Sequence, residues 1–580
     1  MRILGITDGV MAGAALVIDG RLVAAVSEER LCRLKMARGF PRQSIETVLR
    51  TAGVSSHEID RVAVASTCEF FCEEVVPWEG WFQGDRGALS EAFRGAASKV
   101  VRVVGSGRPF QRSYYALKSV LTWRRRPRIR ELLRKELDIV APVQFFDHHL
   151  CHAASAYATA GHPRCLVFTL DGGGDGLSAR IFRGRDGRLE PLGSIPAYDS
   201  IGNYYAYITH LAGFRAHRDE GKMSGLAAHG SPVYRDTLLS FIASERGTLR
   251  NRGRAYYASA LDRLRRVLPR DARREDLAAS MQSVLETEVG KVVAHWVSQS
   301  GESHLALAGG VFANVRLNQE LAELDGVASL SVFPAMGDDG LSAGAALLLA
   351  GREAESRGET PPGESLDHVH LGPSFDDLAV MRALDAEGAT AVALDRPAEV
   401  MADLLARGEV VARFHGAMEY GPRALGHRSL LYRPDDPGGK EWLNDCLRRT
   451  EFMPFAPVTT RELAGRCFLG LDPVLAAARF MTVTVPCSPE FRERCPGVVH
   501  VDGTARPQIV VDSVDPEYAE IVRIFHRTTG LPALVNTSFN MHEEPIVCSP
   551  EDALRAWREV GILHLFLGRH HVKKLRERSP

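Results

Sequence analysis

The sequence has no CxxC pair among its ten cysteines, and no apolar run reaches the roughly 18 residues that span a membrane. Scattered cysteines in a chain of 580 residues argue against a disulfide-stapled secreted domain. The cysteines within apolar runs predict buried free thiols at Cys32, Cys151, Cys165 and Cys548. Residues 9–18 are apolar, but no basic stretch precedes them, so they do not form a signal peptide. We therefore expect a cytoplasmic protein with reduced thiols and no membrane partner.

An excess of charge of either sign is also missing. The 71 Lys and Arg residues balance 72 Asp and Glu residues, for a formal net charge of −1. No overall basic field draws such a chain to nucleic acid, so we expect no nucleic-acid partner. Apolar residues at 45% and charged residues at 25% are typical of globular proteins and exclude disorder as the main state. The length is roughly two to four times that of a typical domain, which predicts several domains.

A pattern of strand, Gly/Asp turn, strand, turn and strand occurs twice. The predicted strands cover residues 2–7, 13–18 and 21–26 in the first copy, and 165–170, 177–182 and 189–192 in the second. Two copies indicate an internal duplication. This arrangement resembles the actin, Hsp70 and sugar-kinase superfamily, whose paired hairpins grip the phosphates of ATP between two lobes. The alternative is two ordinary β-hairpins.

Glycine-rich turns beside these strands predict contacts with a nucleotide. Residues 171–176 form one such turn, and residues 305–307 form a strand that leads through two glycines into a helix. Backbone amides without a neighbouring Cβ approach an anion closely, and a helix N-terminus favours a phosphate. The predicted contacts are Asp171, Gly172, Gly173, Gly174, Asp175, Gly309, Gly310 and Asn314.

Residues 351–371 are rich in Gly, Pro and Glu and predict a linker between domains at 1–350 and 372–580. Two Arg-rich stretches, residues 123–135 and 246–274, interrupt the first domain. Apolar residues at helical spacing in the first stretch favour a solvated amphipathic helix. The alternative is a patch that recruits substrate or faces RNA.

Two histidines predict a metal site. His148 and His152 lie four residues apart at the start of a predicted helix, so both project from one face, whereas His149 points elsewhere. Asp171 and Asp338, each at a strand end, would complete the ligand set. Such a His₂Asp₂ set suits Fe²⁺, Mn²⁺ or Zn²⁺ better than Mg²⁺. The alternative is a capped helix start whose histidines are satisfied by hydrogen bonds.

Arginines beside Gly, Pro and hydroxyl residues recur in the second domain, within residues 419–429, 449–457, 502–508 and 536–540. Guanidinium groups match phosphate geometry, so these segments predict a pocket for an oxyanion or a phosphate. The alternative is structural pairing of Arg with carboxylates at turns. The candidate residues are Arg423, His427, Arg428, Arg449, Arg506, Asn536, Ser538 and Asn540.

With these motifs in order, the chain resembles the NodU/CmcH/TobZ family of O-carbamoyltransferases from end to end. The matching residues are Glu28, Glu29, Arg30 and Lys35, with residues 148–152, 171–176, 220–227, 309–314, 421–429, 454–457 and 536–540. The resemblance implies an α/β fold in two parts. The N-terminal part would be an actin-like (ASKHA) two-lobed domain, and the C-terminal part a YrdC-like domain.

The resemblance also implies the reaction. The C-terminal part would use ATP, with Mg²⁺, and carbamoyl phosphate to make carbamoyl-adenylate. The N-terminal part would hold that adenylate on a divalent metal, iron in the relatives, and transfer the carbamoyl group to a hydroxyl of a small molecule. Glu220 and Lys222 would contact the nucleotide, and Lys35 would neutralise a phosphate. The expected setting is antibiotic or other secondary metabolism, and a homodimer is left open.

Two departures from the family pattern affect the expected site. Val10 and Met11 stand where relatives carry His-Asp, so the general base is unassigned, with Asp8 as a candidate. That wall would be apolar and would favour a macrolide, ansamycin or deoxysugar acceptor over an aminoglycoside. Leu447, Thr450 and Met453 replace polar residues before residues 454–457, although Arg449 matches. Two rival functions are a small-molecule kinase of the actin-like superfamily and an RNA-modifying or RNA-binding protein.

Overall fold

A computed structural model describes residues 1–82, 96, 108–361, 363, 365–436, 438–447 and 455–574. The chain divides into two units, Met1–Glu28 with Met36–Leu366, and Glu29–Lys35 with Asp367–Pro580. It therefore enters the second unit briefly within the short helix α1 (Glu28–Cys32). Helix α13 (Leu341–Ser356) continues past residue 351, where we predicted the linker to start. Ala354 is 3% exposed, so packing of the last turn keeps this polar sequence helical.

The first sheet of unit 1 combines a three-stranded meander with two parallel strands. Its order is β3-β2-β1-β5-β7. The bounds are β1 (Arg2–Thr7), β2 (Gly13–Ile18), β3 (Arg21–Ser27), β5 (Arg61–Ala65) and β7 (Val143–Phe146). Asp19 and Gly20 both have positive φ, at 49° and 81°, which is the backbone of the predicted two-residue hairpin turn.

The second sheet of unit 1 repeats that order, β10-β9-β8-β13-β14, with β13 parallel to both β8 and β14. The bounds are β8 (Arg164–Gly174), β9 (Leu177–Arg185), β10 (Arg188–Pro196), β13 (His304–Ala308) and β14 (Ser329–Val332). The structure thus confirms the predicted duplication. One detail was wrong, because β8 runs on through Gly174 with a register shift after Leu170, and only Asp175 and Gly176 form the turn.

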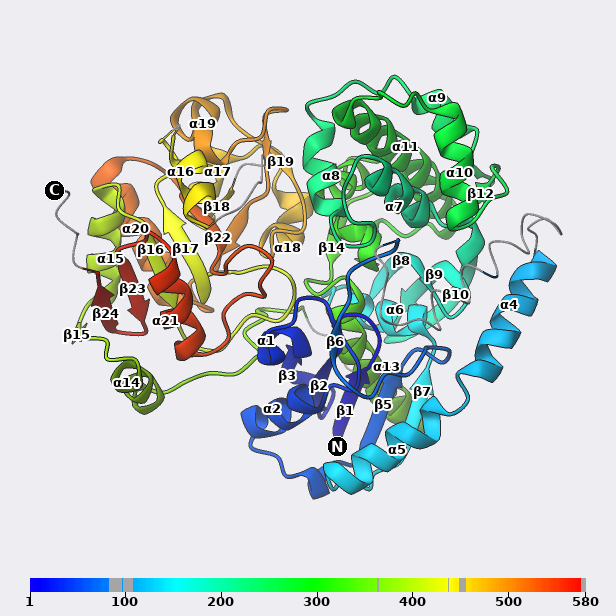
Figure 1. Ribbon diagram of the computed structural model, residues 1–580, viewed down its shortest axis with the longest axis horizontal. Helices are drawn as coiled ribbons and strands as arrows, with labels where there is room; N and C mark the ends of the chain where they lie inside the picture. The colour runs from blue at the N-terminus through cyan, green and yellow to red at the C-terminus, as the bar shows by residue number, and fades with distance from the viewer. Residues whose placement is uncertain are drawn as a thin grey trace. The chain divides into compact units, whose positions relative to one another are not determined.

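Helices cover both sheets of unit 1 (Figure 1). Helix α13 packs against β1, β5 and α6 (His148–Ala158), and its buried Leu341, Ala345 and Leu349 join the core. Helix α5 (Arg125–Glu136) buries Ile129, Leu132 and Leu133, which confirms the predicted amphipathic helix. Further helices of this unit are α2 (Arg42–Ala52), α4 (Arg108–Leu121), α7 (Ile201–Leu211), α8 (Glu220–Ala227), α9 (Arg235–Leu239), α10 (Ala258–Val267), α11 (Arg274–Ser300) and α12 (Val315–Ala322).

Unit 2 is built on an eight-stranded mixed sheet of order β15-β24-β23-β16-β17-β22-β18-β21. Its strands are β15 (Ala391–Ala393), β16 (Val411–Phe414), β17 (Arg428–Tyr432), β18 (Ala456–Thr460), β21 (Gln508–Val510), β22 (Leu534–Ser538), β23 (His564–Leu567) and β24 (His570–Lys573). Its helices are α14 (Asp377–Ala386), α15 (Pro397–Ala406), α16 (Gly439–Cys446), α17 (Arg461–Cys467), α18 (Leu475–Ala478), α19 (Pro489–Arg494), α20 (Pro516–Thr529) and α21 (Pro550–Glu559). Both units are therefore mixed α/β.

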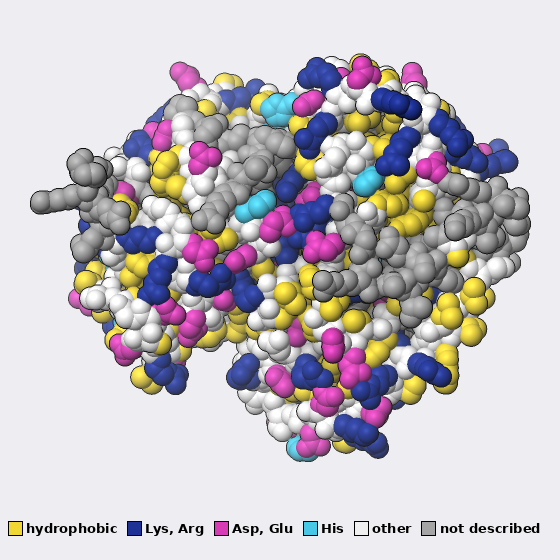
Figure 2. Space-filling view, in the orientation of Figure 1, with side chains coloured by type: hydrophobic (Ala, Val, Ile, Leu, Met, Phe, Trp, Pro, Cys, Tyr) yellow, Lys and Arg dark blue, Asp and Glu magenta, His cyan; other side chains and the backbone are white. Residues whose placement is uncertain are grey.

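The surface and the thiols agree with the sequence, with one exception. Lys and Arg side chains are interspersed with Asp and Glu over the face drawn in Figure 2. All ten cysteines lie in the described part of the chain and are free, but Cys32 is only half-buried because it ends the short helix α1. Among the described residues, no helix has the length and apolarity to cross a membrane.

Candidate functional site

Helix α6 presents the two predicted metal-binding histidines at its N-terminus. Strand β7 ends at Phe146, and Asp147 caps the helix by accepting a hydrogen bond from the Leu150 N–H at 2.9 Å. His148 and His152 follow on one helix face. His149 points away, with Nδ1 2.9 Å from Thr169 Oγ1 and Nε2 3.0 Å from the Leu177 carbonyl.

The structure brings His148, His152, Asp171 and Asp338 together, although they come from α6, β8 and the segment before α13. Asp171 Oδ2 lies 3.3 Å from His148 Nε2 and 3.3 Å from His152 Nε2. Asp338 Oδ1 lies 3.5 Å and 3.6 Å from the same two nitrogens. The two histidines are buried and the two aspartates are half-buried. The structure therefore brings together the two histidines and the two aspartates that the sequence analysis proposed as one ligand set.

These four residues fit a transition metal. Metal–ligand bonds of about 2.0–2.2 Å in a tetrahedron put neighbouring ligand atoms roughly 3.3–3.6 Å apart. The four nitrogen–oxygen distances, 3.3 to 3.6 Å, match that edge. Both ring nitrogens of His152 are buried and have no hydrogen-bond partner within the described residues. Because an orphaned imidazole in the interior is costly, the donor set indicates a cation at this position.

The charges of the site shift the pKa values of its members. Burial opposes a charged imidazole, but the Asp338 and Asp171 carboxylates outweigh it and raise the pKa of His148 to about 10. Burial, with the neighbouring His148 and His152, lowers the pKa of His149 to about 3. Burial raises the carboxyl pKa of Asp171, but its close contacts with the imidazoles of His148 and His152 bring it well below its usual value. Burial and the Asp171 charge raise the pKa of Asp338. The carboxylates thus favour a positive charge between them.

Neighbouring residues fix the position of the His148 ring. The sequence motifs did not assign them this role. Ser66 Oγ lies 3.1 Å from His148 Nδ1. The Asp175 carboxylate accepts hydrogen bonds from the backbone N–H groups of Thr67, Cys68 and His148 at 2.7–2.9 Å. A Cβ on Gly174 would lie 2.2 Å from the His148 ring, so only glycine fits there. Asp175, predicted to contact a nucleotide, is instead engaged as a backbone brace.

Asp8, the candidate general base, forms a buried ion pair with Arg125. Its two carboxylate oxygens accept hydrogen bonds from Arg125, including Nε at 2.9 Å, and both side chains are almost fully buried. Arg125 also donates to the carbonyls of Ala65 and Ser66. Asp8 therefore joins the first turn to α5, and the structure corrects its predicted role as a free base. Sequence spacing gave no signal for this pair, because the two residues lie far apart in the chain.

The predicted nucleotide-contacting residues are spread over neighbouring turns of unit 1. Gly172 donates its N–H to Asp171 Oδ1 at 2.6 Å, Gly173 follows in β8, and Gly309 and Gly310 connect β13 to α12. Asn314 is engaged in the fold, because its side chain caps α12 and is hydrogen-bonded to Gln282. At the start of α8, Lys222 lies 3.3 Å from Asp219, and burial raises the pKa of Glu220 to about 7.

In unit 2, Arg428 is a structural residue rather than a phosphate ligand. It is fully buried, donates to the carbonyls of His415, Gly416, His427 and Cys548, and stacks 3.7 Å over the Phe414 ring. Burial lowers its pKa to about 10. The adjacent Gly and Pro residues predicted an anion pocket, but strand β17 directs this side chain inward, where backbone carbonyls receive it.

The other candidates of unit 2 differ in how far they are engaged. Asn536 is buried and donates to the Ala424 carbonyl and to Gln508, while Ser538 donates to Asn540. Arg423 and Arg506 are half-buried, and Arg449 lies outside the described residues. Lys35 is half-buried and belongs with unit 2 by its contacts. In the same segment, Arg30 donates to the Gly421 carbonyl at 2.9 Å.

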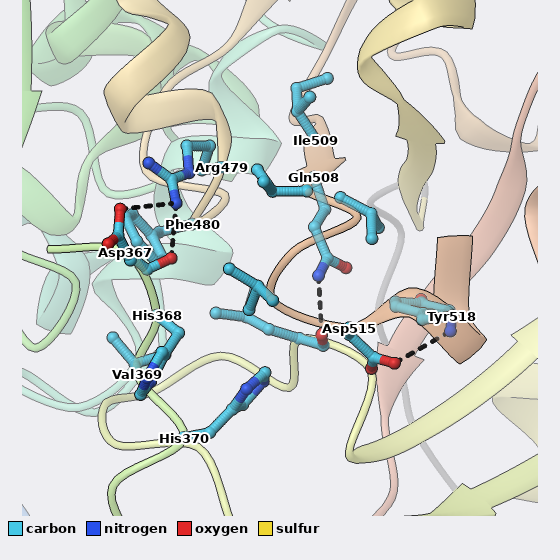
Figure 3. A pocket seen from close by; sticks show the side chains of 14 residues that line it. Asp367, His368, Val369, His370, Arg479, Phe480, Gln508, Ile509, Asp515 and Tyr518 are labelled. Carbon is cyan, nitrogen blue, oxygen red and sulfur yellow. Dashed lines mark hydrogen bonds and ion pairs between the residues drawn. The ribbon is translucent and has the colours of Figure 1, made fainter. Parts of the chain in front are cut away.

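A small cavity in unit 2 lies beside a group of histidines. Its lining includes His368, His370, Gln508, Asp515 and Tyr518, and the Tyr518 N–H donates to Asp515 (Figure 3). His370 stacks on His427 with ring centroids 3.6 Å apart. His427, a predicted phosphate-site residue, directs Nε2 to Asp515 Oδ2 at 3.2 Å. The sequence analysis missed His370, His415 and Asp515, although Asp515 followed by Pro516 is a recognisable helix start.

Comparison with solved structures finds distant similarity. The (R)-2-hydroxyglutaryl-CoA dehydratase component A of Acidaminococcus fermentans is 14% identical, with a TM-score of 0.33 over 61% of this chain and 99% of that one. The ROK hexokinase of Thermus thermophilus is 17% identical, with a TM-score of 0.25 over 60% of this chain and 98% of that one.

Comparison with sequence families gives a decisive match. The models described as Carbamoyltransferase N-terminus and Carbamoyltransferase C-terminus match residues 2–347 and 402–574. The nodulation protein NolNO of Sinorhizobium fredii is 33% identical over 98% of this chain and 79% of its own length. NolO of Bradyrhizobium diazoefficiens is 34% identical over 74% of this chain and 79% of its own length. With a family model covering most of unit 1 and a second covering most of unit 2, the chain belongs to the carbamoyltransferase family and is a carbamoyltransferase.

Proposed function

We propose that the protein is an ATP-dependent O-carbamoyltransferase acting on a small-molecule alcohol. In unit 2, carbamoyl phosphate is hydrolysed to carbamate and phosphate, and the carbamate oxygen attacks the α-phosphate of Mg²⁺-bound ATP, releasing pyrophosphate. In unit 1, the acceptor hydroxyl attacks the carbamoyl carbon of carbamoyl-adenylate, AMP leaves, and the hydroxyl proton passes to a base. The observation that carries the proposal is the His₂Asp₂ cluster in the N-terminal part of a carbamoyltransferase.

The strand order supports an actin-like assignment for unit 1. Both of its sheets join an antiparallel meander to two parallel strands, and the glycine-rich turns lie at the ends of β8 and β13. We assign unit 2 as YrdC-like on the sequence resemblance. The carbamoyltransferase family assignment favours carbamoyl transfer over the kinase and RNA-binding alternatives.

Each residue of the first site has a role in this proposal. His148, His152, Asp171 and Asp338 would hold Fe²⁺, or Mn²⁺ or Zn²⁺, and the ion would polarise the carbamoyl oxygen. Ser66 and Asp175 orient His148, and burial of both histidines keeps water from the labile adenylate. Lys35 would neutralise a phosphate. Glu220, whose pKa burial raises to about 7, accepts a hydrogen bond from the N–H of His217, and the His217 ring lies beside Gly172 of the proposed nucleotide turn.

The direct test is an assay of purified protein with carbamoyl phosphate, MgATP and a panel of alcohols. We expect a product heavier than its alcohol by one carbamoyl group, with equal amounts of AMP and pyrophosphate. Formation of a phosphorylated product, or a carbamate without ATP consumption, would contradict the proposal.

One prediction concerns the phosphate pocket of unit 2. Arg506→Ala should slow carbamoyl-phosphate-dependent ATP–pyrophosphate exchange, because removing a charged hydrogen bond from a dry site costs roughly 2–4 kcal/mol, or about 30- to 1000-fold in rate. Arg461→Ala is the matched control, since Arg461 is exposed and pairs with Asp472 at 2.7 Å. Exchange by Arg506→Ala at the rate of this control would remove Arg506 from the site.

A further prediction concerns the acceptor. Met11 has a positive φ of 57°, and its sulfur lies 3.7 Å from the position of a Cβ built on Gly337, next to the metal-site residue Asp338. This apolar side chain supports our proposal of a lipophilic acceptor of secondary metabolism, such as a macrolide, an ansamycin or an attached deoxysugar. A cationic acceptor would lose hydration there without gaining a carboxylate.

We therefore expect a hydrophobic polyketide alcohol to show a higher kcat/KM than an aminoglycoside. Val10→His should narrow that preference, whereas Val140→His, at a residue 71% exposed elsewhere in unit 1, should not. Faster carbamoylation of the aminoglycoside by the unaltered protein would rule out the lipophilic acceptor.

A further inference from the structure

Three metal-ligand side chains that do not belong to the first centre, His415, His427 and Asp515, meet in unit 2, and the Glu517 carboxylate lies beside His415. His415 follows strand β16, His427 precedes strand β17, and Asp515 and Glu517 begin helix α20. We infer that these residues form a second transition-metal site, of the zinc type, that ties the loop between β16 and β17 to α20. This inference is independent of the carbamoyl chemistry proposed above.

The distances between these side chains suit a bound ion. His427 Nε2 lies 3.2 Å from Asp515 Oδ2, and His415 Nδ1 lies 3.5 Å from Glu517 Oε1. Ligand atoms of His415, His427 and Asp515 all lie within 4.8 Å of one another. Tetrahedral zinc with bonds of about 2.0–2.2 Å separates neighbouring ligand atoms by roughly 3.3–3.6 Å. The His427–Asp515 distance is therefore close to one edge of a zinc tetrahedron, with His415 within reach as a third ligand and the Glu517 carboxylate next to His415.

The position of the proton on the His427 ring also supports a bound metal ion. Its Nδ1 lies 2.6 Å from the Ala417 carbonyl, which only accepts hydrogen bonds, so Nδ1 carries the proton. In a neutral imidazole, Nε2 then directs its lone pair at a carboxylate oxygen, and a cation between the two relieves that repulsion. A backbone carbonyl that fixes the remote ring nitrogen is the usual support of a metal-bound histidine. His415 Nδ1 is also buried without a hydrogen-bond partner among the described residues.

The surrounding charges leave room for a cation. Arg413 donates to Asp515 at 3.0 Å and to Glu517 at 3.0 Å, so one guanidinium serves two carboxylates. Glu419 adds a buried carboxylate, and its Oε2 has no hydrogen-bond partner within the described residues. Arg428 brings a second positive charge, but its donors are taken by backbone carbonyls. Three carboxylates against two guanidiniums leave a net negative environment for an ion.

The adjacent space is suited to an ion and water rather than to a nucleotide. The cavity that Asp515 and His370 help to line has a volume of about 30 Å³ (Figure 3). A cavity of that size holds only one or two water molecules. The stacked ring of His370 closes one face of His427. The His370 ring would therefore shield a metal bound to His427 on that face.

The experiment measures zinc bound at this site in a variant that lacks the two histidines of the first site. Full-length His148→Ala/His152→Ala protein is stripped with a chelator and dialysed against Zn²⁺, and bound zinc is measured by elemental analysis. We expect about one zinc per chain. Adding His415→Ala or His427→Ala should remove it, and the visible bands of Co²⁺-loaded protein should disappear in parallel. Adding His368→Ala is the control, because His368 stacks in the same region but contributes no ligand.

Zinc retained at the same stoichiometry after either ligand substitution would overturn the inference. So would the absence of zinc from a parent variant that keeps its native circular dichroism. In either case, the contact between His427 and Asp515 forms without a metal ion. If His427→Ala fails to fold, His415→Ala decides the matter, since His415 is partly exposed and tolerates truncation better.

Discussion

Replacing His148 or His152 with alanine should abolish carbamoyl transfer while leaving carbamoyl-phosphate-dependent ATP–pyrophosphate exchange near the unaltered rate. In the proposed reaction, loss of the ion would remove the polarisation of the carbamoyl oxygen, so we expect kcat/KM for transfer to fall by about 1000-fold or more, equivalent to roughly 4 kcal/mol. Exchange should persist because the adenylate-forming step is assigned to unit 2. The two rates are measured on the same preparations, together with bound metal.

His162→Ala is the matched control for that experiment. His162 belongs to unit 1 and stacks on His304 with ring centroids 3.9 Å apart, but it does not belong to the metal cluster. We expect this variant to keep both activities. If transfer and exchange fall together in well-folded His148→Ala protein, the division of labour between the two units is wrong.

The second large effect concerns stability. Arg125→Met should destabilise unit 1 by about 3–5 kcal/mol, because it leaves the Asp8 carboxylate buried without its counter-charge. Asp8 is 1% exposed and Arg125 is 2% exposed, so water does not replace the missing partner. Urea unfolding followed by circular dichroism measures the change in the free energy of unfolding. Arg130→Met, at an exposed position of the same helix, should change stability little.

A double variant distinguishes charge from shape. Asp8→Asn/Arg125→Met removes both charges, so we expect it to be clearly more stable than Arg125→Met alone. If it is equally unstable, the packing of the Arg125 side chain rather than its charge holds α5 in place. If Asp8→Asn alone abolishes transfer without loss of stability, Asp8 has a catalytic role after all.

Much of unit 1 was predictable because its signals are local. The turn at Asp19 and Gly20, the alternation of apolar strands and the repeat at residues 165–182 depend on neighbours within a few positions. The spacing of His148 and His152 likewise gives their common helix face directly. Asp171 and Asp338 were predictable as partners only because the sequence pattern put each at the end of a predicted strand, although Asp171 lies within β8 in the structure.

The tertiary structure decided which side chains are free to bind a ligand. Arg428 and Arg506 both stand beside residues typical of phosphate pockets, yet only the fold shows that backbone carbonyls surround Arg428. Asp175 and Asn314 were predicted from glycine-rich turns to contact a nucleotide, but backbone N–H groups and Gln282 engage them. Residue type predicts which ligands a side chain is able to bind. Whether that side chain is already hydrogen-bonded within the protein depends on the neighbours that it acquires on folding.

The sequence by itself determined the mixed α/β class, the duplicated sheets and the four side chains of the candidate metal cluster. Those features follow from local periodicity and residue type, which persist before the chain is folded. Only the tertiary structure paired Asp8 with Arg125 and brought His415 and His427 to Asp515. Such pairs join residues far apart in the chain, and burial in a shared interior, rather than any local pattern, leads these polar groups to satisfy one another.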